Sequence, residues 1–321
     1  MEKTRTLANL IQSARAFQES RVLLTALELD VFTTMGDGAT AADIAQKLGT
    51  DLRATSMLLN GLVALGALSK HEAVFRCTKE SKALGPERMG LMHTVHLWDT
   101  WSSLTECVKS GKAVRSRGPE DFPEAQTRAF IAAMHARARD NADQTVRLSG
   151  IRDAKRMLDV GGGSGAFSFA FAQACPELQA EILDLGAVVP LAEEYIRQAG
   201  LQSRVRVRPG DMRAAELGEG FDLVLLSAVC HMFGESENRA LIQRCAQALS
   251  PGGHLVIREF ILEEDRTAPP FAALFALNML VGTEHGNAYT ESEYRTWMED
   301  AGLGDFTRAD PQGDVLVATK I

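Results

Sequence analysis

A glycine-rich turn lies near the middle of the chain, in the stretch MLDVGGGSGAF from Met157 to Phe167. Glycine has no Cβ, so such a turn can adopt positive φ angles and lets a ligand approach the main chain closely. Two spacings fit the turn: Asp-x-Gly-x-Gly-x-Gly from Asp159, and the dinucleotide-binding Gly-x-Gly-x-x-Gly/Ala from Gly161. The turn predicts a nucleotide-bearing ligand, and alone it does not choose between the two patterns.

Several polar residues stand at or just past the ends of expected strands, namely Asp159, Asp184, Asp211, His231 and Glu259. Ligands of open α/β sheets bind beyond the carboxyl ends of the strands, so these side chains are candidates for one site. Asp184 ends the second expected strand, where its carboxylate can accept hydrogen bonds from both hydroxyls of a ribose. NAD and S-adenosylmethionine share that ribose, so Asp184 predicts a nucleoside without distinguishing the two cofactors.

Two other acidic residues favour S-adenosylmethionine. A pyrophosphate would gain from a bare helix N-terminus, whereas a zwitterionic sulfonium would gain from an acidic residue just before the glycines, and Asp159 is such a residue. Asp211, in RPGDM, lies where an acid after the third strand could contact the adenine. These residues indicate a sulfonium cofactor rather than a dinucleotide.

The elements that must position these residues alternate between strand-like and helical segments from about residue 155 to 321. The strand-like runs are RMLDV, AEILDL, RVRVRPGD, FDLVLLSAV and HLVIREFIL, and the expected helices span 166–173, 188–198 and 237–249. This alternation predicts an α/β domain whose mostly parallel sheet carries helices on both faces.

The first half of the chain has a different organisation, which changes near Ser149 and Gly150. We therefore expect two domains, at 1–149 and 150–321. Within the first, a capping box at Thr40 opens a short helix, a second helix runs from about 52 to 65, and two short extended segments follow. This succession predicts a helix-turn-helix with a wing, the architecture of a winged-helix module.

The charge of this module argues against DNA binding. Between residues 30 and 80 the acidic residues outnumber the basic ones, the expected recognition helix holds Arg53 alone among basic residues, and the chain has a net charge of -8. Phosphate contacts need clustered Lys and Arg, so we expect no nucleic-acid partner. An apolar helical face could serve a partner chain or pack within its own domain; it comprises Leu10, Ile11, Ala14, Phe17, Val22, Leu23, Ala26 and Leu27.

Composition places the protein among ordinary globular proteins: 321 residues, 45% hydrophobic and 24% charged. Five scattered cysteines without a CxxC pair indicate reduced thiols rather than disulfides or a zinc site. The N-terminal segment lacks the uncharged core of a signal peptide, and the longest uncharged runs, 160–176 and 267–283, fall short of the roughly 20 apolar residues of a membrane span. The expected location is the cytoplasm, with no membrane association.

With these motifs in order, the chain resembles the small-molecule S-adenosylmethionine-dependent O-methyltransferases that carry an N-terminal winged-helix dimerisation domain. The likeness runs through ALELDVF, ATAADIAQKLG, LDVGGGSGAFSFAFAQACPELQAEILDL, RVRPGDM, FDLVLLSAVCHMF, ALSPGGHLVIREFIL and FALNMLVGTEHGNAYTESEY. It implies a Rossmann-like class I methyltransferase domain, S-adenosylmethionine as cofactor and a homodimer formed through the N-terminal domain. It also implies a small hydroxylated acceptor, aromatic or polyketide-like, and a place in secondary metabolism.

The resemblance assigns roles to the glycine turn and the strand ends. Gly161 and Gly163 would line the methionine portion of the cofactor, and Asp184 would hold the ribose. The remaining residues expected to bind the cofactor are Asp159, Leu185, Gly210, Asp211 and Met212, of which Asp211 and Met212 would border the adenine. The expected acceptor pocket comprises Trp98, Trp101, Asn278 and Met279.

In that family a histidine just after the fourth strand removes the proton of the acceptor, and AVCHMF places His231 there. A neutral phenol attacks a sulfonium methyl poorly, and a histidine that is neutral near pH 7 can accept the proton as charge moves onto sulfur. Glu259, at the end of the next strand, matches the carboxylate that orients the histidine ring.

The pattern departs from the family at three positions. Ala288 stands where a second flanking glutamate is expected, Met232 replaces an aspartate common in plant members, and His285 replaces a small residue. With His285, the chain also resembles relatives that methylate the β-carbon of α-keto acids and look as though they bind a metal through two histidines at about these positions. His231 and His285 could then be ligands of a metal that assists C-methylation. Two further alternatives are a winged-helix regulator that senses the cofactor without turnover, and an NAD-dependent oxidoreductase that uses the dinucleotide spacing.

Overall fold

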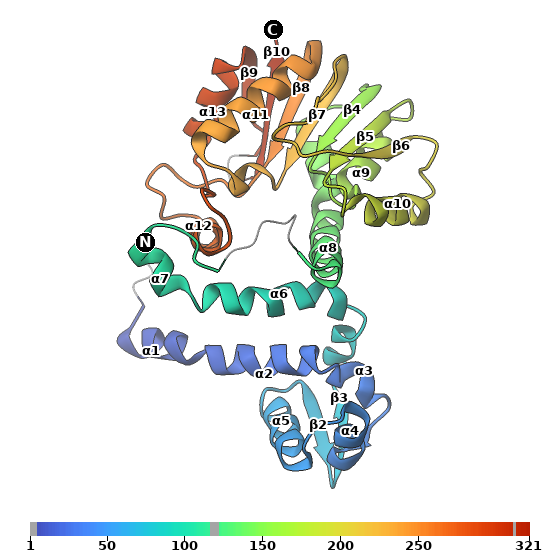
Figure 1. Ribbon diagram of the computed structural model, residues 1–321, viewed down its shortest axis with the longest axis vertical. Coiled ribbons are helices and arrows are strands. Elements are labelled where there is room, and N and C mark those ends of the chain that lie inside the picture. Colours follow the sequence, from blue (N-terminus) through green and yellow to red (C-terminus); the bar gives the residue numbers. More distant parts are fainter. Residues whose placement is uncertain (1–4, 116–121, 311–312) are drawn as a thin grey trace. The chain divides into compact units, whose positions relative to one another are not determined.

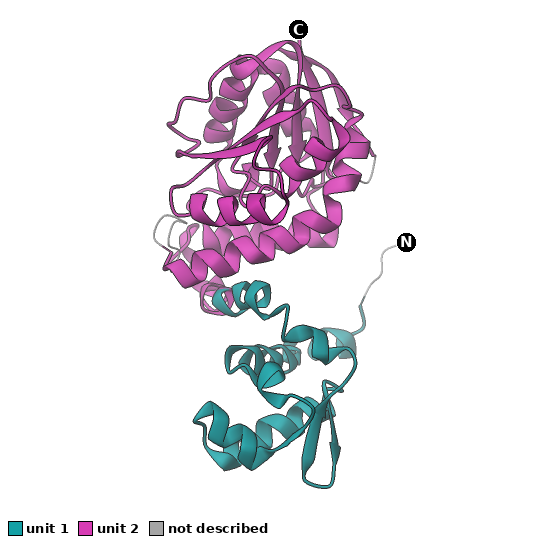
Figure 2. Cartoon of the chain, turned by 90° about the vertical axis from the view of Figure 1, so that its right-hand side faces the viewer, with its two compact units in different colours: residues 1–96 teal, residues 97–321 magenta. Residues whose placement is uncertain are grey.

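The computed structural model describes residues 5–115, 122–310 and 313–321. The chain forms two compact units, residues 1–96 and 97–321 (Figure 2). This division falls before the one expected at 149 and 150. Helix α8, Glu124–Ser149, packs along α9, Ala166–Ala174, and against β10, Val315–Lys320, so it forms part of the second unit.

The first unit contains the expected helix-turn-helix and wing. Its helices are α1 Leu7–Arg15, α2 Phe17–Glu28, α3 Val31–Met35, α4 Ala41–Leu48 and α5 Leu52–Ala64, with the short 3-10 helix η1 at Ser81–Leu84. A small sheet has the order β1-β3-β2, from strands Ala39–Thr40, Val74–Cys77 and Leu68–His71. The expected capping box is present at the start of α4, where the Thr40 hydroxyl accepts from the Asp43 amide at 3.2 Å and the Asp43 carboxylate accepts from the Thr40 amide at 2.9 Å.

The apolar face expected between Leu10 and Leu27 divides into two parts. Ala26 and Leu27 of that face are buried within the unit, as is the neighbouring Leu24, whereas α1 and the start of α2 present apolar side chains to solvent. The exposed side chains are Leu7, Leu10, Ile11 and Phe17, with relative exposures of 73%, 53%, 44% and 57%. The C-terminal part of the face is therefore core, and the N-terminal part is surface.

The second unit is built around a seven-stranded sheet of order β6-β5-β4-β7-β8-β10-β9 (Figure 1). Its strands are β4 Arg156–Val160, β5 Gln179–Asp184, β6 Val205–Pro209, β7 Phe221–Ser227, β8 Leu249–Arg258, β9 Leu303–Arg308 and β10 Val315–Lys320. Strands β4 to β8 pair in parallel, while β10 runs antiparallel to both β8 and β9. The sheet is therefore mostly parallel, as expected.

Helices cover both faces of this sheet (Figure 1). Helices α8, α9 and α10, Val189–Gln198, share one apolar core with Met157, Ile182 and Leu225. Helices α11, Glu235–Ala248, and α13, Glu291–Asp300, share the core on the other face with Leu158, Val224 and Ile257. The side chains of a strand alternate between faces, which explains why neighbours such as Met157 and Leu158 belong to different cores. No helix among the described residues is long and apolar enough to cross a membrane.

The second unit also contains α7 Leu104–Ser110, the 3-10 turn η3 Cys230–Met232 and α12 Pro270–Gly282. Helix α6, Arg88–Trp101, crosses the division between the two units. Strand β4 lies between β5 and β7. The strands that follow β4 are therefore added first on one side of it, as β5 and β6, and then on the other side, as β7 and β8. Such a reversal of strand order opens a crevice at the carboxyl ends of the strands.

Candidate active site

The glycine turn follows β4 and is sterically restricted to glycine at its first position. Gly161 has a φ of 71°, and a Cβ placed there would lie 2.7 Å from Met212 Cε and 2.9 Å from Val229 Cγ2. Both contacts are closer than any real Cβ tolerates. The structure thus brings together the turn after β4, Met212 after β6 and Val229 after β7, as a ligand site at the strand ends requires.

Asp184 joins the second strand to this turn. Its carboxylate, on a residue that is 8% exposed, accepts hydrogen bonds from the backbone amides of Gly163 and Leu185, each at 2.7 Å. The Gly210 amide donates to the Asp184 carbonyl at 2.9 Å. Burial raises the pKa of Asp184, and the two amide hydrogen bonds act in the opposite direction. Gly163, Asp184, Leu185 and Gly210, all expected at the cofactor, therefore lie together.

Asp159 lies beneath the glycine turn rather than on its open side. The residue is 1% exposed, its Oδ2 accepts from the Ser168 hydroxyl at 2.7 Å, and a Cβ on Gly162 would collide with the carboxylate. Its Oδ1 is buried with no hydrogen-bond partner among the described residues. Burial raises the pKa of Asp159 to about 7, and the nearby Asp184 charge contributes to the rise.

Asp211 is the most open of the strand-end acids. Its side chain is 37% exposed and forms an ion pair with Arg213 at 2.8 Å. Hydrogen bonding from Arg213 lowers the pKa of Asp211. The carboxylate is therefore charged at neutral pH and lies beside Met212, at the rim of the crevice.

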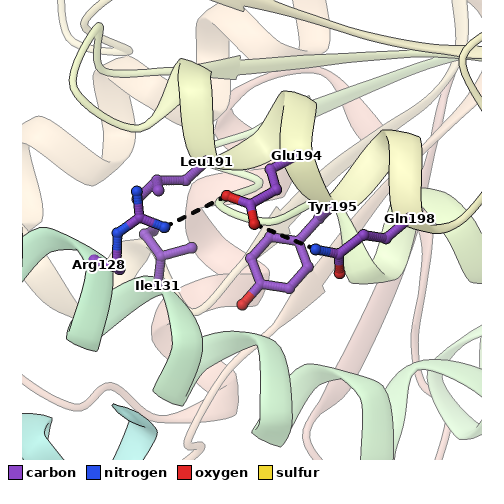
Figure 3. Close-up of a pocket in the computed structure, with 6 residues that line it drawn as sticks. All are labelled: Arg128, Ile131, Leu191, Glu194, Tyr195 and Gln198. Carbon is purple, nitrogen blue, oxygen red and sulfur yellow. Dashed lines mark hydrogen bonds and ion pairs between the residues drawn. The ribbon is translucent and has the colours of Figure 1, made fainter.

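Helix α8 reaches the glycine turn through a histidine that the sequence did not single out. His135 Nδ1 lies 2.8 Å from Ser164 Oγ, and the His135 ring stacks on Tyr195 of α10 with centroids 4.1 Å apart. Burial lowers the pKa of His135. Figure 3 shows the adjoining contact between the two helices, where Arg128 of α8 approaches Glu194 of α10 at 3.4 Å. The sequence contains no local signal for His135, because its partner Ser164 lies 29 residues away and becomes a neighbour only when α8 packs on the sheet domain.

His231 and Glu259 form a buried pair at the ends of β7 and β8. His231 Nδ1 lies 2.8 Å from Glu259 Oε2, and the His231 amide donates to Glu259 Oε1 at 3.3 Å. A carboxylate next to a neutral imidazole accepts the hydrogen bond, so Nδ1 carries the proton and Nε2 presents its lone pair. The two residues are 8% and 2% exposed, so the pair is almost completely removed from solvent.

Aromatic side chains surround the His231 ring. Phe275 of α12 meets it edge to face at 4.8 Å, and Phe260 lies 6.0 Å from it. Phe260 also packs on Phe275 at 4.4 Å and on Phe271 at 5.0 Å. Phe260 and Phe271 were not expected here, because the sequence alone does not distinguish them from ordinary core residues. Phe260, Phe271 and Phe275 together form an aromatic wall, and such a wall is suited to a flat apolar molecule.

The expected acceptor-pocket residues come from two helices of the second unit. The Trp101 indole nitrogen donates to the Asn278 side-chain oxygen at 2.8 Å, and both residues are partly buried. Asn278 follows Phe275 by three residues in α12, so the two side chains share a face of the helix. Met279 is 7% exposed, and Trp98 is partly buried one turn before Trp101.

Two of the positions that depart from the family pattern, His285 and Ala288, differ in their surroundings. The His285 side chain is 64% exposed and its Nε2 lies 3.6 Å from Glu284. Ala288 is 1% exposed and packs with Leu262 and Ala272 in an apolar cluster. The described residues contain no group of three or more side chains placed to hold a metal ion.

The chain matches known proteins along almost its whole length. A family model for the O-methyltransferase domain matches residues 108–304, and one for the O-methyltransferase dimerisation domain matches residues 11–86. The chain is 32% identical to 3-hydroxy-5-methyl-1-naphthoate 3-O-methyltransferase of Streptomyces sahachiroi, over 92% of this chain and 89% of that protein. It is 30% identical to the tetracenomycin polyketide synthesis 8-O-methyl transferase of Streptomyces glaucescens, over 92% and 91%.

A solved structure shares the same architecture. An O-methyltransferase family protein from Burkholderia thailandensis superposes with a TM-score of 0.88 at 26% identity, and the match covers 99% of this chain and 98% of that one.

Proposed function

The chain belongs to the S-adenosylmethionine-dependent O-methyltransferases, and we propose that it methylates a hydroxyl of a small aromatic, polyketide-like acceptor with His231 as general base. The expected family and the expected fold class, a Rossmann-like methyltransferase domain after a winged-helix dimerisation domain, are both confirmed by the family and structural matches. The cofactor follows from the family. The acceptor, the base and the individual contacts are our proposals.

The residues of the crevice fit S-adenosylmethionine. Gly161 and Gly163 leave the main chain of the turn open to the methionine portion, and Asp184 offers a buried carboxylate to the ribose hydroxyls. Asp211 and Met212 would border the adenine, next to Leu185 and Gly210. Asp159 would support the turn from below, and its ionised form would add negative charge near the cofactor's cationic groups. When bound, the cofactor supplies an electrophilic methyl group on a positively charged sulfur.

The observation that carries the proposed mechanism is the hydrogen bond between His231 and Glu259 at 2.8 Å. Glu259 holds the proton on Nδ1 and leaves Nε2 free to accept the proton of the acceptor hydroxyl as negative charge develops on its oxygen. Glu259 then faces the imidazolium that forms. General-base assistance of this kind contributes about 10² to 10⁴ in rate.

The aromatic wall supports the proposed acceptor class. Phe260 and Phe275 lie beside His231, and Phe271 packs on both of them. A flat polycyclic phenol would pack on these rings while its hydroxyl meets Nε2. The two Streptomyces relatives are named for a hydroxylated naphthoate and for a polyketide, which supports the same class here.

The geometry supports a base rather than a metal ligand at His231. The His285 side chain is 64% exposed, with its Nε2 3.6 Å from Glu284. The hydrogen bond of Glu259 to Nδ1 fits either role, because metal-bound histidines also donate their second N–H to a carboxylate. A two-histidine metal site would need both imidazoles to converge on one point.

We further propose a homodimer formed through the first unit and a cytoplasmic location. The match to a dimerisation domain and the exposed apolar side chains of α1 support the dimer. The location rests on the five buried free cysteines, a usage typical of reducing compartments.

The test is incubation of the full chain with S-adenosylmethionine and a panel of hydroxynaphthoates, simple phenols and α-keto acids, followed by mass spectrometry for one added methyl group. His231→Ala is expected to lower turnover of the hydroxynaphthoates by about 10² or more and to leave cofactor affinity unchanged. His254→Ala is the matched control, because His254 binds Thr319 in the sheet at 3.1 Å. Methylation of a keto-acid carbon, or full activity of His231→Ala, would refute the proposal.

A further inference from the structure

The proposed base is carried by a very short element. His231 is the middle residue of η3, a three-residue 3-10 turn between β7 and α11. Such turns have poorer hydrogen-bond geometry than α-helices, so a single turn does not fix a side chain firmly by itself. The turn is also buried, and its carbonyl groups therefore need partners from elsewhere in the fold.

Asn238 supplies partners on both sides of His231. Its side-chain nitrogen donates to the Cys230 carbonyl at 2.9 Å and to the Phe233 carbonyl at 3.2 Å. An asparagine amide has two N–H donors on one nitrogen, so a single side chain brackets the turn. Asn238 is 0% exposed and lies in the first turns of α11, where a helix normally buries an apolar side chain.

Two further contacts hold the same turn. The Tyr289 hydroxyl donates to the Phe233 carbonyl at 2.6 Å, and the Asn287 amide donates to the His231 carbonyl at 2.9 Å. Burial raises the pKa of Tyr289 to about 12, so its phenol keeps the proton that it donates at neutral pH. The carbonyls of Cys230, His231 and Phe233 are thereby satisfied from α11 and from the segment before α13.

Among the described residues, Glu259 is the side chain that hydrogen-bonds to the His231 ring. Glu259 contacts Nδ1, while Ala288 occupies the position at which the family resemblance implies a second carboxylate. Ala288 packs in an apolar cluster and offers no side-chain hydrogen bond. The orientation of the ring therefore depends more strongly on where the backbone of η3 is held.

We propose that Asn238, assisted by Tyr289, is a positioning residue for His231 that acts through the backbone of η3. This inference rests on the proposed function, since it assumes that His231 is the base. Loss of the Asn238 donors lets the turn shift relative to Glu259, and Nε2 then moves away from the acceptor hydroxyl. A misplacement of about 1 Å at a reacting group costs about 10²-fold in rate.

The experiment compares Asn238→Leu, which keeps the volume and removes both donors, with Tyr289→Phe, which removes the hydroxyl alone. In the full chain, Asn238→Leu is expected to lower kcat about 10- to 100-fold and Tyr289→Phe about 3- to 10-fold. The dissociation constant of S-adenosylhomocysteine should remain within about twofold of wild type in both, because the glycine turn and Asp184 are untouched.

A spectroscopic readout separates positioning from general stability. The His231 Nδ1 proton, hydrogen-bonded to Glu259, should give a downfield proton resonance in the wild type that is weakened or lost in Asn238→Leu. Ile242→Ala is the matched control, since Ile242 is 0% exposed on the same helix and lies in the same core. It should lower the melting temperature while keeping kcat and the resonance.

Two results would overturn the inference: wild-type kcat and an unchanged resonance in Asn238→Leu, or loss of the resonance in Ile242→Ala as well. If Asn238→Leu does not fold, an unchanged kcat and resonance in Tyr289→Phe decides against the proposal. His231→Ala is measured in parallel. If that variant keeps full activity, the proposed base is wrong. If it is inactive while the other variants behave as wild type, only the role of Asn238 is wrong.

Discussion

Trp101 and Asn278 are 177 positions apart in the sequence, and the Trp101 indole nitrogen donates to the Asn278 side-chain oxygen at 2.8 Å. An indole nitrogen can only donate, so this contact decides which end of the Asn278 amide is occupied. The amide nitrogen is then available to donate to another molecule, one helical turn from Phe275, whose ring contacts the His231 ring.

Trp101→Phe is expected to weaken acceptor binding because the Asn278 amide loses its fixed orientation. A neutral hydrogen bond contributes about 0.5–1.5 kcal/mol, so KM for the acceptor should rise by about two- to tenfold. Steady-state kinetics with a hydroxynaphthoate measures this, with the KM of S-adenosylmethionine as the internal control. A change in the cofactor KM alone would place Trp101 outside the acceptor pocket.

The cofactor contacts can be tested by thermal unfolding. S-adenosylhomocysteine should raise the melting temperature and NAD should not, since binding to the native state stabilises it by about 2.7 kcal/mol at a hundredfold excess over the dissociation constant. Asp184→Ala should lose most of the shift, and Asp143→Ala, at an exposed position of α8, should keep it. A shift with NAD instead would contradict the assignment of the crevice.

Base and metal-ligand roles make different predictions for His285. With His231 as base, His285→Ala should change turnover by less than about threefold, and a chelator should have no effect. If the two histidines hold one metal ion, substitution of either should abolish turnover, because loss of one ligand releases the metal. Turnover after dialysis against a chelator, with metal content measured in parallel, decides between them.

Asp159 should make stability depend on pH in an unusual direction. Its pKa is about 7 in the folded protein, above the ordinary value of 3.8, so the folded state retains a proton that the unfolded state releases. The stabilisation from this group is therefore present at low pH and is lost as pH rises from about 4 to 7. The difference between 3.8 and about 7 corresponds to about 4 kcal/mol at most.

Asp159→Asn removes that titration and keeps an oxygen to accept from Ser168. The free energy of unfolding of the variant, relative to wild type, should rise between about pH 4 and pH 7 and then remain level. Urea unfolding at several pH values without cofactor measures it. Parallel curves for the two proteins would mean that the pKa of Asp159 does not differ between the folded and unfolded states.

The exposed part of the α1 and α2 face should control assembly. Leu10→Glu combined with Phe17→Glu is expected to convert a dimer into a monomer, because both side chains are exposed and neither is needed for the core of the unit. Light scattering measures the mass. Leu52→Glu, an exposed position on α5, is the control and should remain dimeric. A monomeric wild-type chain would refute the proposed interface.

Much of the fold could be predicted from local patterns. The alternating runs after residue 155 mark the parallel strands, and the Thr40 capping box marks the start of α4, because both signals depend on neighbouring residues alone. Strands β9 and β10 were not expected, since β10 pairs with the distant β8 and β9 pairs only with β10 among the described strands. The two compact units meet between residues 96 and 97, whereas the expected boundary lay between 149 and 150. The reason is the same: α8 resembles the helical first half in sequence, and only its packing on α9 assigns it to the second unit.

The candidate site divides in the same way. His231 and Glu259 could be chosen as site residues from the sequence because they stand at strand ends. In the structure, His231 Nδ1 lies 2.8 Å from Glu259 Oε2. Asn238 and His135 could not be chosen from the sequence. The partners of Asn238 are backbone carbonyls and the partner of His135 is Ser164, and these groups become neighbours only when the helices pack on the sheet. Burial of polar helix residues is visible in a structure and is not encoded in the spacing of a single sequence.

The pairing of β4 with β7 limits which parts of this enzyme can alter its acceptor specificity during evolution. The turn proposed for the cofactor follows β4 and the proposed base follows β7, and Val160 of one strand pairs with Leu226 of the other. Adjacent strands are held about 4.8 Å apart by backbone hydrogen bonds, whatever their side chains. The spacing between methyl donor and base is thus inherited from the main chain, whereas the aromatic wall and Asn278 belong to helices and loops outside the sheet. Mutation can therefore explore new acceptors by remodelling those segments while the reaction geometry is passed on unchanged.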